Sequence, residues 1–504
     1  MAAIVAPIAV VAVPGRRNSV RNTTTCTERG IALPPTPLAT RLAQLAASDP
    51  ARPAVTCGGT SLTRQQFDRR TNALARAYAA RGVSAGDLVT IGLPNGVGAL
   101  EAAVATWKLG ATPQPVSYRL PEGEQQAVLD LVRPALVIGL GGPDIEPDAS
   151  DEPLPVAVAP AWKAPTSGGS TGRPKVIMTT QPAVAEVMDE YAGLFGMRPD
   201  GVHLVAGPLY HNAPFMMSAA ALFTGSHVVV MPRFDPAELL RLVEAHRVEW
   251  TFLVPTMMHR IWRLPPEPRD AADLSSLQVV LHGAAPCPPW LKHAWLDWVG
   301  PEQVFELYAS TEAQAGCLIS GTEWLSHPGS VGRVARGELR LLDSDHNDVP
   351  VGEVGEVWMR PSPGDPATYR YLGDTPTTLD GGWESQGDLG RLDEDGYLYL
   401  ADRKPDMILV GGANVFPAEI EAALDEHPAV QSSCVIGLPD DEYGNVVHAV
   451  VQSARPLDVE DLLDHLRQRL VAYKLPRTFE RVEHPLRDDA GKVRRAAVRA
   501  ERLR

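Results

Sequence analysis

The stretch Ser167–Lys175, written SGGSTGRPK, gathers residue types that bind anions. It holds three glycines, three hydroxyl side chains and two cations within nine residues. Glycines expose backbone N–H groups that can surround an anion, and Ser and Thr hydroxyls add donors. It is not the nucleoside-triphosphate P-loop GxxxxGK followed by Ser or Thr, since Pro174 precedes the lysine and no hydroxyl follows it. A phosphate-binding loop and a flexible linker both remain open, and the strand-like KVIM that starts at Lys175 favours the former.

The elements around this loop alternate between helix and strand patterns. Amphipathic stretches such as LTRQQFDRRTNALARAYAARG are separated by short apolar runs such as DLVTIGLP. Further helices are predicted at 182–196 and 236–246. This alternation predicts the α/β class, with a large N-terminal domain of helix-flanked parallel sheets. From about residue 329, short runs such as GEVWMR between Gly and Asp turns predict a β-rich segment.

The chain after residue 402 has the pattern of a separate, small domain. Helices are predicted near 417–427 and 457–471, and AVVQSA is one of several predicted strands. We therefore expect a large domain over residues 35–402 and a small, mobile α+β C-terminal lid domain over residues 403–504. A length of 504 residues agrees, because single cores stop growing at about 250–300 residues. Residues 1–34 are expected to be a disordered extension or a misassigned start. Their arginines follow the apolar run instead of preceding it, which argues against a signal peptide.

Composition excludes some classes of protein. A net charge of −15 argues against a dedicated binder of nucleic acid or of an anionic membrane, although it allows a local basic pocket. The five cysteines show no CxxC or Cys/His clustering, which indicates reduced thiols and no zinc site. No apolar run is long enough to span a bilayer, so a cytoplasmic protein is expected. The oligomeric state stays open, with a homodimer as one option.

Five motifs, in a fixed order along the chain, resemble those of the adenylate-forming superfamily, which includes acyl-CoA synthetases, peptide-synthetase adenylation domains and beetle luciferases. SGGSTGRPK is similar to the phosphate-binding signature of that family, with Gly168 where Ser is common. LYASTE resembles the Y-G-x-T-E motif, GGWESQGD resembles G-W-x-x-T-G-D, DRKPDMILVGGANVFPAEIE resembles the hinge and the loop after it, and GKVRR carries the C-terminal lysine. The resemblance covers roughly residues 35–500 and is nearest to the acyl- and aryl-CoA ligase branch.

This resemblance implies an ATP-dependent ligase. Such an enzyme activates a small carboxylic acid as an acyl-adenylate, releases pyrophosphate, and then passes the acyl group to coenzyme A. The chemistry requires charged groups held in line and developing charge neutralised. The resemblance assigns the cradle of the β- and γ-phosphates, and of the leaving pyrophosphate, to Ser170, Thr171, Gly172 and Lys175.

Three further residues would act at the reacting centre by the same resemblance. Thr311 would donate a hydrogen bond to the α-phosphate, and Glu312 would hold Mg²⁺, for which a carboxylate is a natural ligand. The alternative for this pair is a helix N-terminus, because STEAQ also fits a cap. Lys492 would bridge the α-phosphate and the acid during adenylation, and its alternative is an ordinary solvated tail.

The resemblance also implies a nucleoside site. Asp388 would accept hydrogen bonds from the ribose hydroxyls, and Arg403 would add a second ribose contact. Tyr308 would offer its ring to adenine, while Gly283 and Ala284 would line the other side of the base. The alternatives are a turn-forming role for Asp388 and a core position for Tyr308.

His211, in PLYHNAP, aligns with a position that often borders the acid pocket. With Asn212 it would contact the carboxylate or a ring substituent of the acid, and the alternative is a structural histidine. The acid itself, whether aryl, fatty, amino or nitrite, is left open.

Pro405 departs from the family pattern. In the family, the small domain rotates between the two half-reactions about the residue two places after the arginine matched here to Arg403. Proline fixes φ near −65°, which should hinder a swing that needs φ. An alternative therefore stays open, in which the activated species passes to an amine, or nitrite is activated to form a diazo group. A catalytically inactive nucleotide-binding or scaffold protein is a third reading, against which the intact motif residues count.

Overall fold

The computed structural model describes residues 34–168, 174–411, 413–440, 442–488 and 491–503. They form two compact units. The first unit comprises the chain up to Phe252 with Glu267–Leu281 and Ala367–Thr375, and the second comprises Leu253–Pro266, His282–Pro366 and the chain from Pro376 onward. Residues 403–504 lie wholly in the second unit, while the expected domains of 35–402 and 403–504 stay a prediction. Within the described ranges, every helix is too short or too polar to cross a membrane.

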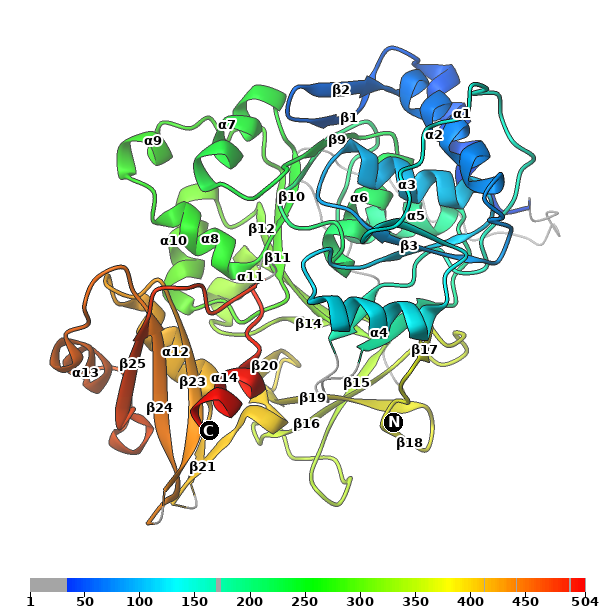
Figure 1. Ribbon diagram of the computed structural model, residues 1–504. Helices are drawn as coiled ribbons and strands as arrows, with labels where there is room; N and C mark the ends of the chain where they lie inside the picture. The colour runs from blue at the N-terminus through cyan, green and yellow to red at the C-terminus, as the bar shows by residue number, and fades with distance from the viewer. Residues whose placement is uncertain (1–33, 169–173, 412, 441, 489–490, 504) are drawn as a thin grey trace, which may run out of the picture. The chain divides into compact units, whose positions relative to one another are not determined.

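The first unit consists of helices and mostly parallel strands (Figure 1). Its helices are α1 (Leu38–Ser48), α2 (Arg64–Ala79), α3 (Val97–Lys108), α4 (Glu122–Val132), α5 (Ala185–Leu194), α6 (Asn212–Phe223), α7 (Pro236–His246) and α9 (Pro266–Asp270). Its strands are β1 (Pro53–Cys57), β2 (Thr60–Thr63), β3 (Leu88–Gly92), β4 (Thr112–Pro115), β5 (Leu136–Gly139), β6 (Thr166–Gly168), β7 (Pro174–Thr179), β8 (Val202–Val205), β9 (His227–Val230), β10 (Trp250–Leu253) and β17 (Tyr369–Leu372). Strand β11 (Val279–Gly283) has residues in both units, as do β10 by its last residue and α9 by its first.

The strand pairing of the first unit confirms the predicted α/β class. Strands β10, β8, β9 and β1 are parallel neighbours, and β2 adds an antiparallel edge. Strands β4, β3 and β5 form a second parallel sheet, and β6, β7 and β17 form a small antiparallel one. Helices α2 and α3 pack side by side (Figure 1). This sheet-and-helix layering is what the alternating sequence pattern predicts.

The second unit is richer in antiparallel strands, as predicted for the chain beyond residue 329. Its helices are α8 (Pro255–Trp262), α10 (Pro289–Val299), α11 (Gly321–Ser326), α12 (Pro417–Glu426), α13 (Val459–Arg467) and α14 (Arg495–Arg502), with 3₁₀ turns η1 (Lys404–Asp406) and η2 (Ala472–Lys474). Its strands are β12 (Val304–Ala309), β13 (Gly316–Ser320), β14 (Arg333–Arg336), β15 (Glu338–Leu342), β16 (Gly355–Arg360), β18 (Thr378–Leu379), β19 (Trp383–Leu392), β20 (Leu398–Arg403), β21 (Ile408–Val410), β22 (Ala413–Val415), β23 (Ser432–Asp440), β24 (Gly444–Gln452) and β25 (Thr478–Val482).

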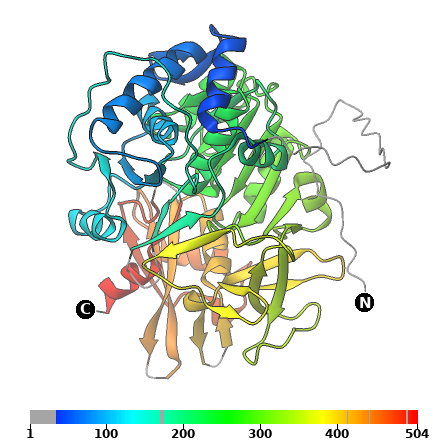
Figure 2. The ribbon, with the colours of Figure 1, turned by 90° about the vertical axis from the view of Figure 1, so that its right-hand side faces the viewer.

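Residues 403–503 contain a core of their own. Helices α12 and α13 cover the sheet β23–β24–β25, and their Ile420, Leu424 and Leu462 share a buried cluster with Val447 of β24. Helix α14, drawn in red, lies beside strand β23 in both views (Figure 2). This arrangement places the end of the chain, with Lys492 just before α14, against the same sheet.

Helix α12 is held at both ends by side chains whose charge suits the helix dipole. At its N-terminus, the backbone N–H of Ala418 donates to Oδ2 of Asp402 at 2.9 Å. Near its C-terminus, the Arg263 guanidinium donates to the carbonyl oxygens of Pro428 at 2.8 Å and His427 at 3.2 Å. A negative group at the start and a positive group at the end both stabilise a helix. The contacts of Asp402 and Arg263 therefore stabilise α12.

Asp425, on α12, is a carboxylate whose ionised form is disfavoured by burial. Burial raises the pKa of Asp425 to about 6, although Arg487 and a hydrogen bond from Ser433 Oγ at 2.7 Å oppose the rise. A raised folded-state pKa contributes stability below the unfolded value of 3.8, and this contribution is lost as the pH rises through about 6. At neutral pH the ionised group therefore costs stability.

Asp425→Asn is expected to raise the free energy of unfolding at pH 7.5 by on the order of 1–2 kcal/mol. Asparagine can still accept from Ser433 and carries no charge to bury. The gain should shrink at pH 5, where the wild-type carboxyl is itself protonated. Urea unfolding of both proteins at the two pH values measures this, and a variant that is no more stable than wild type at pH 7.5 would contradict the assignment.

Candidate functional site

Three of the predicted nucleoside-binding residues meet in the second unit. The phenol of Tyr308, near the end of β12, donates to Oδ2 of Asp388 at 2.7 Å. The Arg403 guanidinium lies 3.3 Å from the other carboxylate oxygen, Oδ1. Asp388 and Arg403 are directly opposite partners on the antiparallel strands β19 and β20, so the strand register itself creates their ion pair.

The electrostatics of this trio fix its hydrogen-bonding roles. Burial raises the pKa of Asp388, and the opposing pull of Arg403 and Tyr308 only partly offsets the rise. Burial and the neighbouring Asp388 carboxylate raise the pKa of Tyr308 strongly, which keeps the phenol neutral and able to donate. Each carboxylate oxygen has a second lone pair, so Asp388 can accept further hydroxyl donors. Tyr308 is half-buried and packs against a hydrophobic cluster, as its core alternative supposed, but its hydroxyl donates to Asp388.

Gly283 lies close to the same strand, β12. A Cβ added to Gly283 would stand 2.4 Å from the carbonyl oxygen of Leu307, the residue before Tyr308, so only glycine fits. The next residue, Ala284, is exposed and has a φ of 68°, in the left-handed region that residues with a Cβ rarely adopt. Residues with a Cβ adopt this conformation mainly in tight turns, and it also occurs at functional sites. The predicted base-lining pair therefore does lie next to Tyr308.

Thr311 and Glu312 lie in a turn, not at the start of a helix. Strand β12 ends at Ala309, and the Ala313 N–H donates to the Ser310 carbonyl at 3.2 Å. Ala313 has a φ of 54°, which again places a residue with a Cβ in the left-handed region. Both Thr311 and Glu312 are half-buried. The helix-cap alternative is therefore wrong.

Nearby charges act on Lys492, and one of them is the Glu312 carboxylate of this turn. Burial lowers the pKa of Lys492, Arg403 lowers it further, and the carboxylates of Asp488 and Glu312 oppose the decrease. Lys492 keeps an exposed surface. The charges of Glu312 and Arg403 therefore act on Lys492, and its place at the reacting centre stays a prediction beside the solvated-tail alternative.

Two hydrogen bonds join Asp488 to Lys492. Asp488 Oδ1 accepts from the Lys492 N–H at 2.9 Å, and the Asp488 N–H donates to the Lys492 carbonyl at 2.9 Å. Gly491 before it is buried and has a φ of 74°. A Cβ at Gly491 would stand 2.7 Å from Oγ1 of Thr256. The backbone of Lys492 is therefore held by its two hydrogen bonds to Asp488.

Lys175 belongs to the first unit and has its own surroundings. Its Nζ donates to the Tyr371 hydroxyl at 3.0 Å and lies 3.6 Å from Oδ2 of Asp374. The cation also stands 4.3 Å from the centre of the Tyr371 ring. Sequence reasoning missed Tyr371 and Asp374, which strand β17 brings to β7. Of the remaining cradle residues, Ser170, Thr171 and Gly172 lie outside the described residues.

His211 also belongs to the first unit, immediately before helix α6. Its ring lies 4.7 Å from that of Tyr210. Asn212, the first residue of α6, accepts at Oδ1 from Nζ of Lys163 at 2.5 Å. Lys163 is buried and lies 4.7 Å from the centre of the Trp162 ring. Sequence reasoning missed Lys163, whose signal was a single cation within the run PAWKAP.

Glu312 is the residue that the sequence predicts to hold a metal. Among the described residues, no three His, Cys, Asp or Glu side chains are grouped to form a protein-only metal site. A single half-buried carboxylate suits Mg²⁺, which keeps its waters and binds through one or two carboxylates plus substrate phosphates. The donor set therefore fits a cation that arrives with a polyphosphate.

Models of two protein families match most of the chain. The family model of the AMP-binding enzyme matches residues 42–165 and 159–364, and that of the AMP-binding enzyme C-terminal domain matches residues 419–492. Feruloyl-CoA synthase of an Amycolatopsis species is 35% identical over 486 residues, which cover 88% of this chain and 95% of the synthase.

Two solved structures share the fold. The amide bond synthetase McbA from Marinactinospora thermotolerans has a TM-score of 0.76 and 27% identity, and the match covers 92% of this chain and 99% of McbA. The o-succinylbenzoate CoA synthetase of Bacillus subtilis, in complex with the acyl-adenylate intermediate OSB-AMP, has a TM-score of 0.77 over 92% of this chain and 98% of that one. Its identity of 24% makes this second likeness one of fold alone.

Proposed function

The chain belongs to the family of AMP-binding enzymes, and we propose that it uses ATP to activate a small carboxylic acid as an acyl-adenylate and then transfers the acyl group to coenzyme A. The observation that carries this proposal is the contact of Tyr308 and Arg403 with Asp388, in the same unit as Lys492 and Glu312, whose charges act on each other. A nucleoside-binding carboxylate, a metal-binding carboxylate and a cation in one place are what adenylation requires.

Each residue of this group has a task in the first half-reaction. Asp388 accepts from the ribose hydroxyls and Arg403 keeps that carboxylate charged, while Gly283 and Ala284 border the base beside Tyr308. Lys492 neutralises negative charge that develops between the α-phosphate and the attacking carboxylate. Because the donors are fixed before the substrates bind, little reorganisation is needed at the moment of reaction.

The phosphates and the metal complete this assignment. Lys175, with Ser170, Thr171 and Gly172, binds the β- and γ-phosphates, and Thr311 binds the α-phosphate. Mg²⁺ held by Glu312 supplies charge neutralisation on the phosphate oxygens when it is bound. Asn212 and His211 border the acid, and the buried Lys163 holds the Asn212 carboxamide in one orientation.

Two observations support an amine as an alternative acceptor. The amide bond synthetase McbA covers almost the whole chain at 27% identity, and that protein's name gives an amine acceptor. Pro405 lies in the 3₁₀ turn η1, directly after Arg403, where a proline restricts φ. An enzyme that passes its adenylate to an amine is therefore the alternative to the coenzyme A ligase.

The experiment is pyrophosphate release from ATP and Mg²⁺ over a panel of acids. Hydroxycinnamic, benzoic, fatty and amino acids and nitrite are each tested alone, with coenzyme A, and with a simple amine. We expect turnover with an aryl or acyl acid that needs coenzyme A to continue beyond one equivalent. Sustained turnover with an amine and without coenzyme A would favour the alternative, and no pyrophosphate with any acid would refute adenylation.

A further inference from the structure

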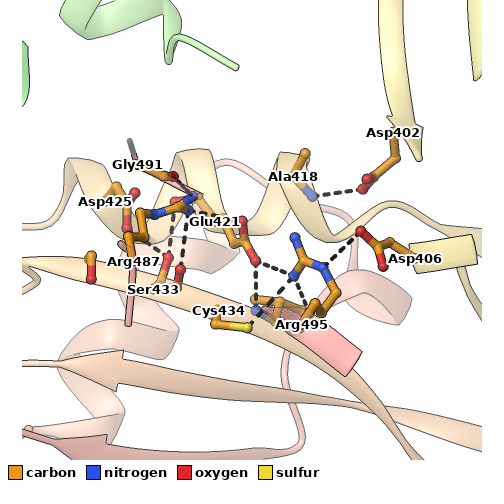
Figure 3. A network of polar contacts seen from close by, with 12 residues as sticks. Asp402, Asp406, Ala418, Glu421, Asp425, Ser433, Cys434, Arg487, Gly491 and Arg495 are labelled. Carbon is orange, nitrogen blue, oxygen red and sulfur yellow. Dashed lines mark hydrogen bonds and ion pairs between the residues drawn. The ribbon is translucent and has the colours of Figure 1, made fainter. Parts of the chain in front are cut away.

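The loop that carries Lys492 is flanked by two arginines that share one buried partner. Arg487 precedes Lys492 by five residues and Arg495 follows it by three. Between the two guanidinium groups lies the carboxylate of Glu421, on helix α12 (Figure 3). Glu421 is 5% exposed. The resemblance to known motifs assigned it no role, and no step proposed above uses it.

Both oxygens of Glu421 are engaged. Oε2 accepts from Nη2 of Arg487 at 3.2 Å, and Oε1 accepts from Nη1 of Arg495. The backbone N–H of Val435 also donates to Oε1, at 2.8 Å. Burial alone would raise the pKa of Glu421, but Arg495 and Arg487 outweigh it and hold the pKa below its usual value. A buried charge with this many donors is a rigid element, because losing any partner would leave the others unpaired.

The network reaches the backbone that presents Lys492. Nη1 of Arg487 donates to the carbonyl of Gly491, the residue before Lys492, at 3.3 Å. Arg487 also pairs with Val493 across the base of the loop as an isolated β-bridge. Two bonds thus connect Glu421 to the loop backbone, first Glu421 to Arg487 and then Arg487 to Gly491. On the other side of the loop, Arg495 begins helix α14.

The same network reaches the turn after Arg403. Nε of Arg495 lies 3.3 Å from Oδ2 of Asp406, in the 3₁₀ turn η1 (Figure 3). Asp406 directly follows Pro405. Arg495 therefore bridges Glu421 on α12 and Asp406 on the turn, and Lys492 lies three residues away in sequence.

We propose that Glu421 is a positioning residue for Lys492. Through Arg487 and Arg495 it fixes both ends of the lysine loop, and through Asp406 it ties that loop to the turn at Pro405. The loop and the turn then keep one geometry relative to each other, so Lys492 reaches the reacting centre at a defined place. This inference rests on the function proposed above, because it gives Lys492 its task in adenylate formation.

The test separates the two half-reactions with the acid that releases pyrophosphate fastest in the panel. Glu421→Gln should lower the rate of adenylate formation about 10–100-fold, since a displacement of about 1 Å is enough for such a loss. The KM for ATP should stay within about twofold, because no nucleotide-binding residue changes. Thioester formation from the synthetic acyl-adenylate and coenzyme A should stay within about threefold of wild type, as it does not use Lys492 in the proposed scheme.

A matched control removes an ion pair from helix α14, which Arg495 begins, without touching Glu421. Arg502 binds both oxygens of Glu480, at 2.6 and 2.7 Å. Arg502→Gln should reduce thermal stability while leaving the ratio of the two half-reaction rates unchanged. If Glu421→Gln slows both half-reactions equally, or behaves as Arg502→Gln does, the positioning role is refuted.

If Glu421→Gln does not fold, three variants of its neighbours test the positioning role. Arg495→Lys keeps a cation opposite Glu421, whereas Arg495→Gln removes it, so adenylate formation should be retained better in the lysine variant. Asp406→Asn should lower adenylate formation about 3–10-fold with thioester formation intact. Equal rates in all three would overturn the inference. A wild-type enzyme that releases no pyrophosphate would instead overturn the proposed function itself.

Discussion

Lys492→Ala is expected to slow adenylate formation about 10²–10³-fold, the cost of removing one preorganised charge from a reacting centre. The affinity for ATP should change by less than about threefold, because Lys492 acts on the α-phosphate and the acid only as they react. Rapid-quench measurement of pyrophosphate release, together with equilibrium binding of ATP, gives the two numbers separately.

The pH dependence gives a second signature for Lys492. Burial lowers its pKa, so the wild-type rate should fall with rising pH at a lower pH than the ordinary lysine value of 10.5 would give. The alanine variant should lack this alkaline decline. Lys474 is a suitable control, because it lies in the same C-terminal region and pairs at 2.5 Å with Glu419, a residue outside the site. A Lys492→Ala enzyme with near-normal pyrophosphate release, or one no slower than Lys474→Ala, would show that the lysine is not catalytic.

Elements with polar ends and one apolar face could be predicted from the sequence. Helix α7 begins and ends at the predicted residues 236 and 246. Asp235 accepts from the Glu238 N–H at 2.9 Å, Pro236 occupies the first helical turn, and Arg247 ends the helix in the left-handed conformation. Each of these signals is local, so neighbouring residues alone determine them.

Helix α6 could not be predicted in this way. Its residues 214–223 are all buried, so the helix has no polar face and its sequence lacks the 3.6-residue period. Strand β19 was missed for another reason, since GGWESQGD reads as a turn while the structure pairs it with three strands, β16, β18 and β20. That pairing is what sets Asp388 opposite Arg403.

Some residues of the site could be predicted from the sequence, and others could not. Motif order predicted Tyr308, Asp388 and Arg403, which the structure brings together. It could not predict Glu421 as the partner of two arginines, because that contact joins residues 66 and 74 positions apart. Lys163 was equally hidden, since its Asn212 contact spans 49 positions. Contacts of this length depend on tertiary packing, which no local pattern records.

Asp388→Asn is expected to raise the KM for ATP about 10–100-fold, because a hydrogen bond to a charged group contributes about 1.5–3 kcal/mol. Asparagine has the same size and can still accept from Tyr308, so the strand pairing of β19 should persist. The free energy of unfolding should not fall, even though the affinity for ATP does. The pKa of Asp388 is raised by burial, so its stabilising contribution is lost as the pH rises through that pKa, and a neutral side chain restores it at pH 7.5.

Asp393 provides the matched control, because it also accepts from a tyrosine but serves no ligand. It accepts from the Tyr399 hydroxyl at 3.0 Å and the Tyr397 N–H at 2.8 Å. Burial would raise its pKa, but these bonds and His327 outweigh it and lower the pKa, so its ionised form contributes stability that is lost only as the pH falls. Asp393→Asn at pH 7.5 should therefore lower the melting temperature and leave the KM for ATP unchanged, the reverse of Asp388→Asn. If both variants lose stability and neither loses affinity, then Asp388 is a structural residue and the nucleoside lies elsewhere.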